Sequence, residues 1–421
     1  MPEAFDYDVA IVGGGPAGSS TALHLVRHEG VRPHRIVVLD KAKFPRDKPC
    51  AGAVSQLGLD VLSAIGVDVA VPCVTMEGVR VLQGETVGET VDRMGIVIRR
   101  TEFDAHLLET ARCDGVHVKD GEGLSAIDRC EGRRKGFVLT TTLGAKVRAR
   151  FVAAADGAGS TTRKLLGIRE PDRKGHLYVL DTERVAFDAA IGRGLVDFDL
   201  TVLEDGVEGY YWDFPTMLDG AVQVSRGIYH ANLTRPDAAT IQGSVKDVLG
   251  RALARRGIDI AKVKLRPFST RPFVPRSTGW VKGVLLVGEA YGIDQTTGEG
   301  IAQAIEMGRF AASHLAVAFR TDNPRFDAYE REVRTSTTGR HLLQSAWMAR
   351  RVYGRIGHPA RRFLLRSAGA RAAAIRWYRG ESLSMSTRPR SRRIRLRVSA
   401  TSRGRRVGCG GASASPVCAD G

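Results

Sequence analysis

Apolar and polar segments alternate regularly over the first forty residues. Residues 9–12 form a short apolar run that ends in glycines, and residues 16–29 show the spacing of apolar positions that is typical of a helix. Residues 35–40 form a second apolar run. The order strand, helix, strand predicts a βαβ unit at the start of the chain.

The pattern changes further along the chain. It predicts helices over 55–65, 100–111 and 298–318, and a buried strand over 283–287. Alternating apolar and polar positions predict strands over 71–98, over 116–151 and in several segments of 176–280. We therefore expect a parallel sheet with helices and, inserted into it, a mostly antiparallel sheet.

Glycines follow the first strand with a specific spacing. Gly13, Gly15 and Gly18 complete a G-x-G-x-x-G motif between the predicted strand and helix. Gly13 allows a tight turn, Gly15 lets the backbone approach a pyrophosphate, and Gly18 lets the helix pack against the strand. Asp40 ends the second strand 22 residues after Gly18 and can accept hydrogen bonds from ribose hydroxyls. Together these features predict a dinucleotide site.

These elements predict an α/β fold with a discontinuous Rossmann-type domain. We assign residues 1–70, 99–175 and 281–339 to the dinucleotide domain and residues 71–98 and 176–280 to an inserted, mostly antiparallel β-sheet domain for the substrate. Residues 340–383 are expected to form a C-terminal helical, basic extension. Residues 384–421 are rich in Arg, Ser and Gly, and we expect them to be disordered.

The charge of the chain is concentrated at its C-terminal end. The formal net charge is +17, and residues 340–421 hold 19 arginines, no lysine and only two acidic residues. Residues 1–339 are therefore balanced, and the basic pI says little about the predicted active domains. The tail 384–421 lacks interleaved aromatic residues and a recognisable fold, so we expect no specific nucleic-acid partner.

The remaining composition points to a cytoplasmic protein without a metal. The start of the chain has no secretory leader pattern, and the apolar runs are far too short to cross a bilayer. The six cysteines form no Cys-x-x-Cys pair, which indicates reduced thiols. His24 and His28 lie four residues apart without further ligands nearby in sequence, so we expect an exposed helix face there.

Later motifs resemble those of the flavoprotein monooxygenase superfamily. Residues 155–163 (Ala-Asp-Gly-Ala-Gly-Ser-Thr-Thr-Arg) resemble its "DG" signature, and Gly288-Glu289-Ala290 with residues 297–301 (Thr-Gly-Glu-Gly-Ile) resembles its "GD" signature. Arg100 begins a segment that resembles the arginine-bearing helix start of that family. The resemblance implies FAD as the cofactor. The family usually has Asp at the position of Glu289.

Two further stretches resemble the geranylgeranyl reductase branch of these FAD-dependent oxidoreductases. Residues 41–52 contain Lys48-Pro-Cys50-Ala51-Gly, which resembles its "P-x-x-K-x-C-x-G" motif, and residues 209–215 resemble its "Y-x-W-x-F-P" strand. The order and spacing of the motifs match over roughly residues 5–320. The resemblance implies reduction of C=C bonds in an isoprenoid or other lipid-like substrate, by hydride transfer from reduced flavin.

The resemblance and the dinucleotide motif together define the candidate site. Cys50 is the candidate catalytic residue, as a group that lines the flavin or helps to protonate the product; a small packing residue is the alternative. Tyr211, Trp212 and Phe214 are candidates for an apolar wall around the substrate, with ordinary core packing as the alternative. The expected FAD-binding residues are Gly13, Gly15, Pro16, Ala17, Gly18, Asp40, Lys41, Lys48, Cys50, Ala51, Arg100, Asp156, Gly288, Glu289, Gly298, Gly300 and Ile301.

Several questions stay open from the sequence. An aromatic monooxygenase would share the FAD motifs, and a flavin halogenase would too, although its W-x-W-x-I-P motif is absent from the chain. Only one dinucleotide fingerprint is present, so NAD(P)H would have to dock transiently or another electron donor would act. The apolar and arginine residues of 340–383 suggest peripheral membrane contact, with a solvated helical cap as the alternative.

Overall fold

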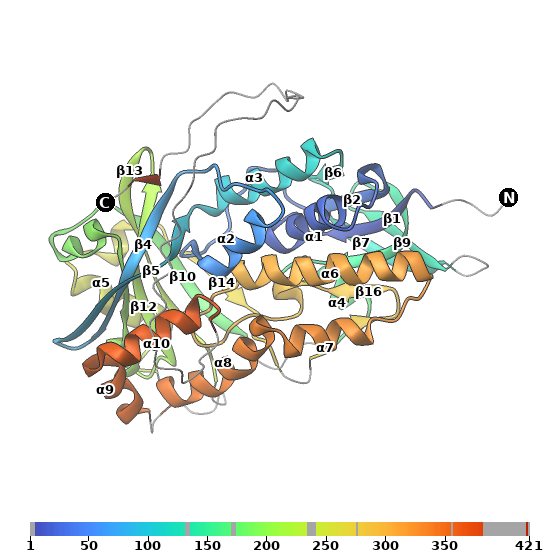
Figure 1. Ribbon diagram of the computed structural model, residues 1–421. Coiled ribbons are helices and arrows are strands. Elements are labelled where there is room, and N and C mark those ends of the chain that lie inside the picture. Colours follow the sequence, from blue (N-terminus) through green and yellow to red (C-terminus); the bar gives the residue numbers. More distant parts are fainter. Residues whose placement is uncertain are drawn as a thin grey trace, which may run out of the picture.

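A computed structural model describes residues 5–130, 135–169, 174–233, 241–274, 277–354, 357–381 and 418–419. Two sheets lie side by side, and helices flank both (Figure 1). The predicted α/β class, with a Rossmann-type domain and a mostly antiparallel second sheet, is confirmed.

The first sheet carries the predicted βαβ unit. Strands β9, β1, β2 and β6 run parallel in this order, and β16 extends the parallel part beyond β9. Antiparallel strands β15, β8 and β7 complete the sheet. Its strands are β1 (Tyr7–Val12), β2 (Ile36–Asp40), β6 (His117–Asp120), β7 (Leu124–Cys130), β8 (Gly136–Thr141), β9 (Lys146–Ala154), β15 (Trp280–Val281) and β16 (Val284–Leu286).

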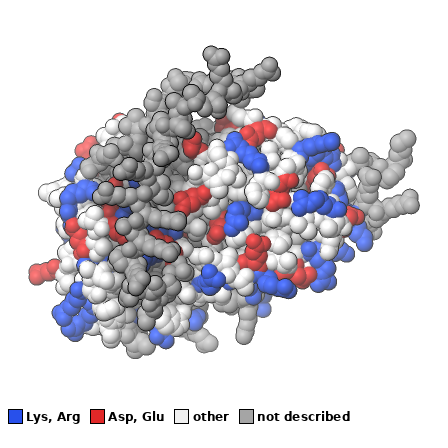
Figure 2. Space-filling model, in the orientation of Figure 1, with Lys and Arg blue, Asp and Glu red and all other residues white. Residues whose placement is uncertain are grey.

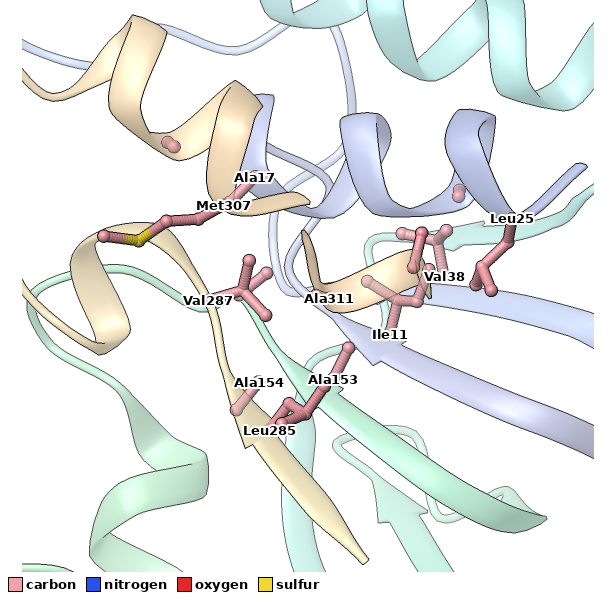
Figure 3. Close-up of a cluster of buried hydrophobic side chains, with 14 of the residues drawn as sticks. Ile11, Ala17, Leu25, Val38, Ala153, Ala154, Leu285, Val287, Met307 and Ala311 are labelled. Carbon is pink, nitrogen blue, oxygen red and sulfur yellow. The ribbon is translucent and has the colours of Figure 1, made fainter. Parts of the chain in front are cut away.

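Apolar strands and two helices form the largest buried cluster. Figure 3 shows Ile11, Val38, Ala153 and Leu285 from the strands beneath residues of α1 and α6, and all of them are buried. The two helices pack closely, because a Cβ at Gly308 would lie 2.8 Å from the Cβ of Ser20. The helices around this sheet are α1 (Pro16–Arg27), α2 (Gln56–Ser63), α3 (Arg100–Cys113), α4 (Thr161–Leu165), α6 (Ile301–Thr321) and α7 (Asp327–Thr335).

The second sheet is antiparallel except where β11 and β17 each pair parallel with β4. Helix α5 (Val245–Ala254) packs on one face, where Val248 and Leu249 are buried against Tyr211 and Ile228. The strands, in spatial order, are β14 (Arg266–Thr270), β10 (Gly175–Thr182), β13 (Ala221–His230), β12 (Gly209–Leu218), β11 (Leu195–Asp199), β4 (Cys73–Gln83), β5 (Thr86–Ile98) and β3 (Ala53–Ser55), with β17 (Cys418–Ala419) beside β4.

Three C-terminal helices, α8 (Thr337–Tyr353), α9 (His358–Arg366) and α10 (Ala368–Tyr378), lie along the second sheet (Figure 1). Leu365, Ile375 and Tyr378 are buried in a cluster with Trp212 and Phe214 of β12. The tail expected to be disordered, 384–421, lies outside the described residues except for the two residues of β17. No helix among the described residues is long and apolar enough to span a membrane.

Two expectations about single residues are wrong. His24 is buried, and its imidazole contacts the backbone carbonyl of Ser20, because its side of α1 faces α6 rather than solvent. Burial lowers the pKa of His24 to about 4. Cys73 in β4 is disulfide-bonded, which differs from the expected reduced thiol. The balanced charge of residues 1–339 agrees with Figure 2, where basic and acidic side chains are interspersed over the visible described surface.

Candidate FAD site

The predicted motifs gather at one edge of the first sheet. Gly13 follows β1, Asp40 ends β2, Asp156 follows β9 and Gly288 follows β16, and these four strands are parallel. Carboxyl ends of parallel strands meet at one edge, where open α/β sheets bind their ligands. Sequence segments that lie more than 200 residues apart are thus brought together, as the motifs require.

The first turn requires glycine and is held by Asp40. Gly13 has a φ of +107°, and a Cβ there would lie 2.4 Å from the carbonyl oxygen of Ala155. Asp40 accepts hydrogen bonds from the N–H groups of Gly14 at 2.7 Å and Ala42 at 2.8 Å. A Cβ at Gly18 would lie 1.8 Å from the oxygen of Gly13, so the helix start needs that glycine too. Pro16 and Ala17 form the first turn of α1 and are buried.

Two arginines face the start of α1 across Gly15. A Cβ at Gly15 would lie 3.5 Å from Nη2 of Arg46 and 3.9 Å from Nη2 of Arg100. Both guanidinium groups pair with the buried carboxylate of Asp104, at 2.8 Å and 2.7 Å. Because two cations share one carboxylate, positive charge remains. The buried Nη1 of Arg46 has no hydrogen-bond partner in the described part of the chain. A helix N-terminus with this charge suits a pyrophosphate.

Cys50 and Lys48 lie beside this group. The Cys50 thiol is half-buried, accepts the N–H of Gly52 at 3.4 Å and lies close to Arg100. Burial alone would lower the pKa of Arg100, but Asp104 and Cys50 raise it above its ordinary value. Lys48 donates to Glu289 at 3.0 Å, so two residues expected to bind FAD pair with each other.

A polar pocket continues from these residues to the second sheet. Lys48, Cys50, Ala51 and Arg100 line one side of it. On the opposite side lie residues of β10, β12, β13 and β14, which include Asp181, Thr216, Ser225 and Arg266. The pocket thus lies between the two sheets, next to the predicted cofactor residues.

The loop before α6 completes the site. Gly298 has a φ of +66°, and a Cβ there would lie 3.5 Å from the ring of Tyr229. Gly300 caps α6, whose first residue is Ile301. The first turn of a helix carries N–H groups without an intrahelical partner and the positive end of the helix dipole.

Glu299 lies buried between the two glycines and accepts the N–H of Ala302 at 3.0 Å. Burial raises its pKa to about 7, while that hydrogen bond and the nearby His341 oppose the increase.

Strand β12 presents its aromatic residues on two faces. Trp212 and Phe214 belong to the cluster beneath the C-terminal helices, and Tyr210 lies there too. Tyr211 lies on the opposite face, beneath α5, and donates to Asp213 at 2.7 Å. Side chains alternate along a strand, so Tyr211 does not share one wall with Trp212 and Phe214, contrary to the expectation. Tyr210 takes its place, and its hydroxyl donates to the carbonyl of Thr297.

Other predicted residues have more local surroundings. Asp156 accepts hydrogen bonds from the Ser160 hydroxyl at 2.6 Å and from the N–H of Thr162 at 2.8 Å, which holds the turn before α4. Lys41 is exposed. Gly288 has a φ of +60° and packs against α1, where a Cβ would lie 2.8 Å from that of Ala17.

Comparison with known proteins gives the family. A family model described as an FAD binding domain matches residues 6–339, and the chain therefore belongs to this family. It is an FAD-dependent oxidoreductase, and its relatives include proteins named as geranylgeranyl-type and menaquinone reductases. The digeranylgeranylglycerophospholipid reductase of Thermoplasma volcanium is 26% identical over 368 residues, which cover 82% of this chain and 87% of that one.

Solved structures share the fold. A geranylgeranyl bacteriochlorophyll reductase-like protein from Thermoplasma acidophilum matches with a TM-score of 0.71 and 22% identity, over 88% of this chain and 96% of that one. The flavin-dependent halogenase CmlS matches with a TM-score of 0.62 and 20% identity, over 83% of this chain and 64% of that one.

The residues at the sheet edge fit FAD. The glycine turn leaves room for a pyrophosphate, Arg46 and Arg100 supply charge for it, and the start of α6 supplies N–H groups. Sequence reasoning missed Arg46, Asp104 and Tyr210. Residue 46 lies in the loop that was singled out for Lys48 and Cys50, but nothing in its local pattern indicates that it turns toward Gly15.

Proposed function

We propose that the protein reduces C=C bonds of an isoprenoid or similarly apolar substrate. The observation that carries this proposal is the aromatic stripe of Tyr210, Trp212 and Phe214 on one face of β12. Its first member bonds the loop before α6, and Ala51, which follows Cys50, packs against the same cluster. The three rings are buried beneath the C-terminal helices, and a lipid chain that enters beside them would lie in the apolar, water-excluding surroundings that this chemistry requires. The similarity to an enzyme that is named for reducing digeranylgeranylglycerophospholipid supports this substrate class.

Bound FAD supplies hydride transfer to the alkene in this proposal. The residues of the chain orient the flavin and the alkene and control where the proton comes from. Cys50 lies at the pocket between the sheets, and its thiol is the candidate proton source for the second carbon. A C50A variant that keeps full activity would argue that water supplies the proton instead.

The decisive experiment is anaerobic. The FAD-loaded protein is reduced chemically and mixed with a geranylgeranyl lipid in the absence of oxygen. We expect the lipid to reoxidise the flavin and to yield a saturated product in the mass spectrum. If the lipid leaves the flavin reduced, while air and an aromatic compound give a hydroxylated product, the protein is a monooxygenase.

The electron donor is a separate proposal. We propose that NAD(P)H docks transiently, because the chain carries a single G-x-G-x-x-G motif in the βαβ context. Rapid mixing of the oxidised holoprotein with NADH or NADPH under nitrogen measures flavin bleaching directly. If neither nucleotide bleaches the flavin while dithionite does, a different donor reduces it.

We further propose that the C-terminal helices contact a membrane surface. Leu343, Trp347 and Phe363 are exposed on α8 and α9, and the guanidinium of Arg351 lies 3.9 Å from the ring centre of Trp347. Residues 340–380 contain arginines but no acidic residue. Exposed aromatic residues among arginines suit anionic lipid, where an isoprenoid substrate also resides.

Sedimentation with anionic vesicles tests this contact. We expect the double variant W347S/F363S to lose most of the binding, whereas L143S, which changes a still more exposed leucine on the β8–β9 turn, keeps it. Equal sedimentation of the wild type and both variants would overturn the membrane proposal without affecting the reductase assay in detergent.

A further inference from the structure

The loop Asp294–Gly300, which leads into α6, is held by α8, most of which lies beyond the matched family region. Ser345 of α8 accepts the N–H of Gln295 at 2.6 Å and the N–H of Thr296 at 3.2 Å, and it donates to the carboxylate of Asp294. Its backbone carbonyl accepts the Thr296 hydroxyl at 2.8 Å. Ser345 is fully buried, so these contacts are shielded from water. The family match ends at residue 339, near the start of α8.

Three tyrosine hydroxyls bind successive carbonyl groups of the same loop. Tyr229 of β13 donates to Gln295 at 3.3 Å, Tyr353 of α8 donates to Thr296, and Tyr210 of β12 donates to Thr297. Two strands of the second sheet and helix α8 therefore all bind the backbone of this loop. Because backbone groups are fixed at three consecutive residues, the start of α6 has little freedom to move.

A contact between an imidazole and a carboxylate and a ring stack add to this arrangement. His341 of α8 lies 3.4 Å from the carboxylate of Asp294, and its ring stacks on Trp377 of α10 with a centroid distance of 3.7 Å. Burial alone would raise the pKa of Asp294, but His341, Ser345 and Thr297 lower it below its ordinary value. The loop thus holds a buried carboxylate that side chains of α8 and of the loop itself stabilise in its charged form.

We propose that α8 and α10, through Ser345, Tyr353 and His341, position the loop Asp294–Gly300 and thereby set both the affinity for FAD and the reduction potential of the bound flavin. The loop leads into the helix whose N-terminus would face bound FAD, and reduced flavin carries more negative charge than oxidised flavin. A displaced helix start weakens binding of both forms. An Asp294 carboxylate that has lost its contact with His341 weakens mainly the binding of the reduced form, because that form carries the additional negative charge. These three are positioning residues, and the inference goes beyond the substrate proposed above.

The test uses the full chain and measures FAD directly. The variants are S345A, Y353F and H341Q. The controls are S336A, which removes the hydroxyl that caps the start of α8, and Y7F, whose hydroxyl bonds His117 at the edge of the first sheet. FAD affinity comes from fluorescence titration of the apoprotein, and the potential comes from reduction against a reference dye. Circular dichroism and thermal unfolding report on folding.

We expect S345A and Y353F to weaken FAD binding at least about tenfold, since each leaves buried backbone groups of the loop without a partner. H341Q should weaken the binding of reduced FAD about tenfold more than the binding of oxidised FAD. This difference lowers the two-electron reduction potential of the bound flavin by about 30 mV. S336A and Y7F should match the wild type in both measurements.

The proposal is overturned if S345A and Y353F lose thermal stability but bind FAD with wild-type affinity and potential. It is also overturned if the control substitutions weaken FAD binding as much as the test substitutions do, because α8 then affects FAD only through the general stability of the fold. If S345A does not fold, Y353F decides the matter, since it removes a single hydroxyl. No substrate enters these measurements, so a failed lipid assay leaves them informative.

Discussion

Asp104 shows how one buried residue sets the charge of the cofactor site. Its carboxylate accepts Arg100 through two hydrogen bonds at 2.7 Å and also pairs with Arg46. With one negative charge for two positive charges, the group keeps an excess cation at the helix start without leaving any charge unpaired. Burial of an arginine without such a partner would be far more costly.

Arg46 is therefore expected to contribute strongly to FAD affinity. R46Q should raise the dissociation constant for FAD about tenfold, because a charge-assisted hydrogen bond to phosphate is lost. R46K should recover part of the affinity as a point charge. Fluorescence titration measures both. R35Q removes an arginine that pairs with Asp8 near the N-terminus and should bind FAD normally; a similar loss there would contradict the assignment.

Glu299 predicts a pH effect on stability. Burial raises its pKa to about 7, so between the unfolded value of 4.5 and about 7 the folded protein holds a proton that the unfolded chain releases. Its contribution to stability is complete below about 4.5 and is lost as pH rises through about 7. Urea unfolding of the apoprotein measures the free energy of unfolding at pH 5 and at pH 8. From pH 5 to pH 8, the wild type should lose up to about 3 kcal/mol more of this free energy than E299Q does. E109Q, at an exposed glutamate, should behave as wild type.

Strand β12 illustrates what pattern alone can give at the scale of an element. Its sequence indicates a strand rich in aromatic residues, and the structure confirms the strand over Gly209–Leu218. The sequence did not separate its two faces, because every side chain from Gly209 to Thr216 is buried and the usual polar alternation is missing. The distinguishing signal was Asp213, a carboxylate two residues after Tyr211 in an otherwise apolar run.

Asp213 joins the second sheet to α5 and the loop that follows it. Its carboxylate accepts Tyr211 at 2.7 Å, Arg226 of β13 at 2.5 Å and Arg256 at 2.5 Å, and all of these groups are buried. Removal of the charge leaves two buried guanidinium groups with less compensation. D213N should therefore destabilise the protein by about 3–5 kcal/mol in urea unfolding.

The matched control for D213N is D322N. Asp322 pairs with Arg150 but is highly exposed, and such pairs contribute at most about 1 kcal/mol. If D213N and D322N cost the same, the buried network does not hold α5 to the sheet in the way that its geometry indicates.

At the scale of the whole molecule, sequence reasoning succeeds where motifs follow strands. Gly13, Asp40 and Gly288 could be placed together because parallel strands end at one edge. Contacts that depend on packing between distant segments could not be predicted. Ser345 reaches Asp294 across 51 residues, and nothing local to either residue indicates the pairing. The burial of His24 could not be predicted for the same reason, because it depends on where α6 lies.

The candidate FAD site and the adjoining pocket draw on both sheets, which predicts how the molecule responds to FAD. Lys48 and Cys50 come from the first segment, Ser225 and Arg266 come from the second sheet, and the loop before α6 is bonded by Tyr210 and Tyr229 of that sheet. A ligand that contacts both sheets stabilises their arrangement as well as each part. FAD at about 100 times its dissociation constant should stabilise the protein by about 2.7 kcal/mol.

Calorimetry of the apoprotein and the holoprotein measures this effect. We expect FAD to move the unfolding of both sheets to higher temperature in a single transition, because the tyrosine contacts transmit loop ordering to the second sheet. A holoprotein in which only one of two transitions shifts would mean that the sheets unfold independently. In that case the bonds from Tyr210 and Tyr229 to the loop carry little energy, and the site is completed only when substrate binds.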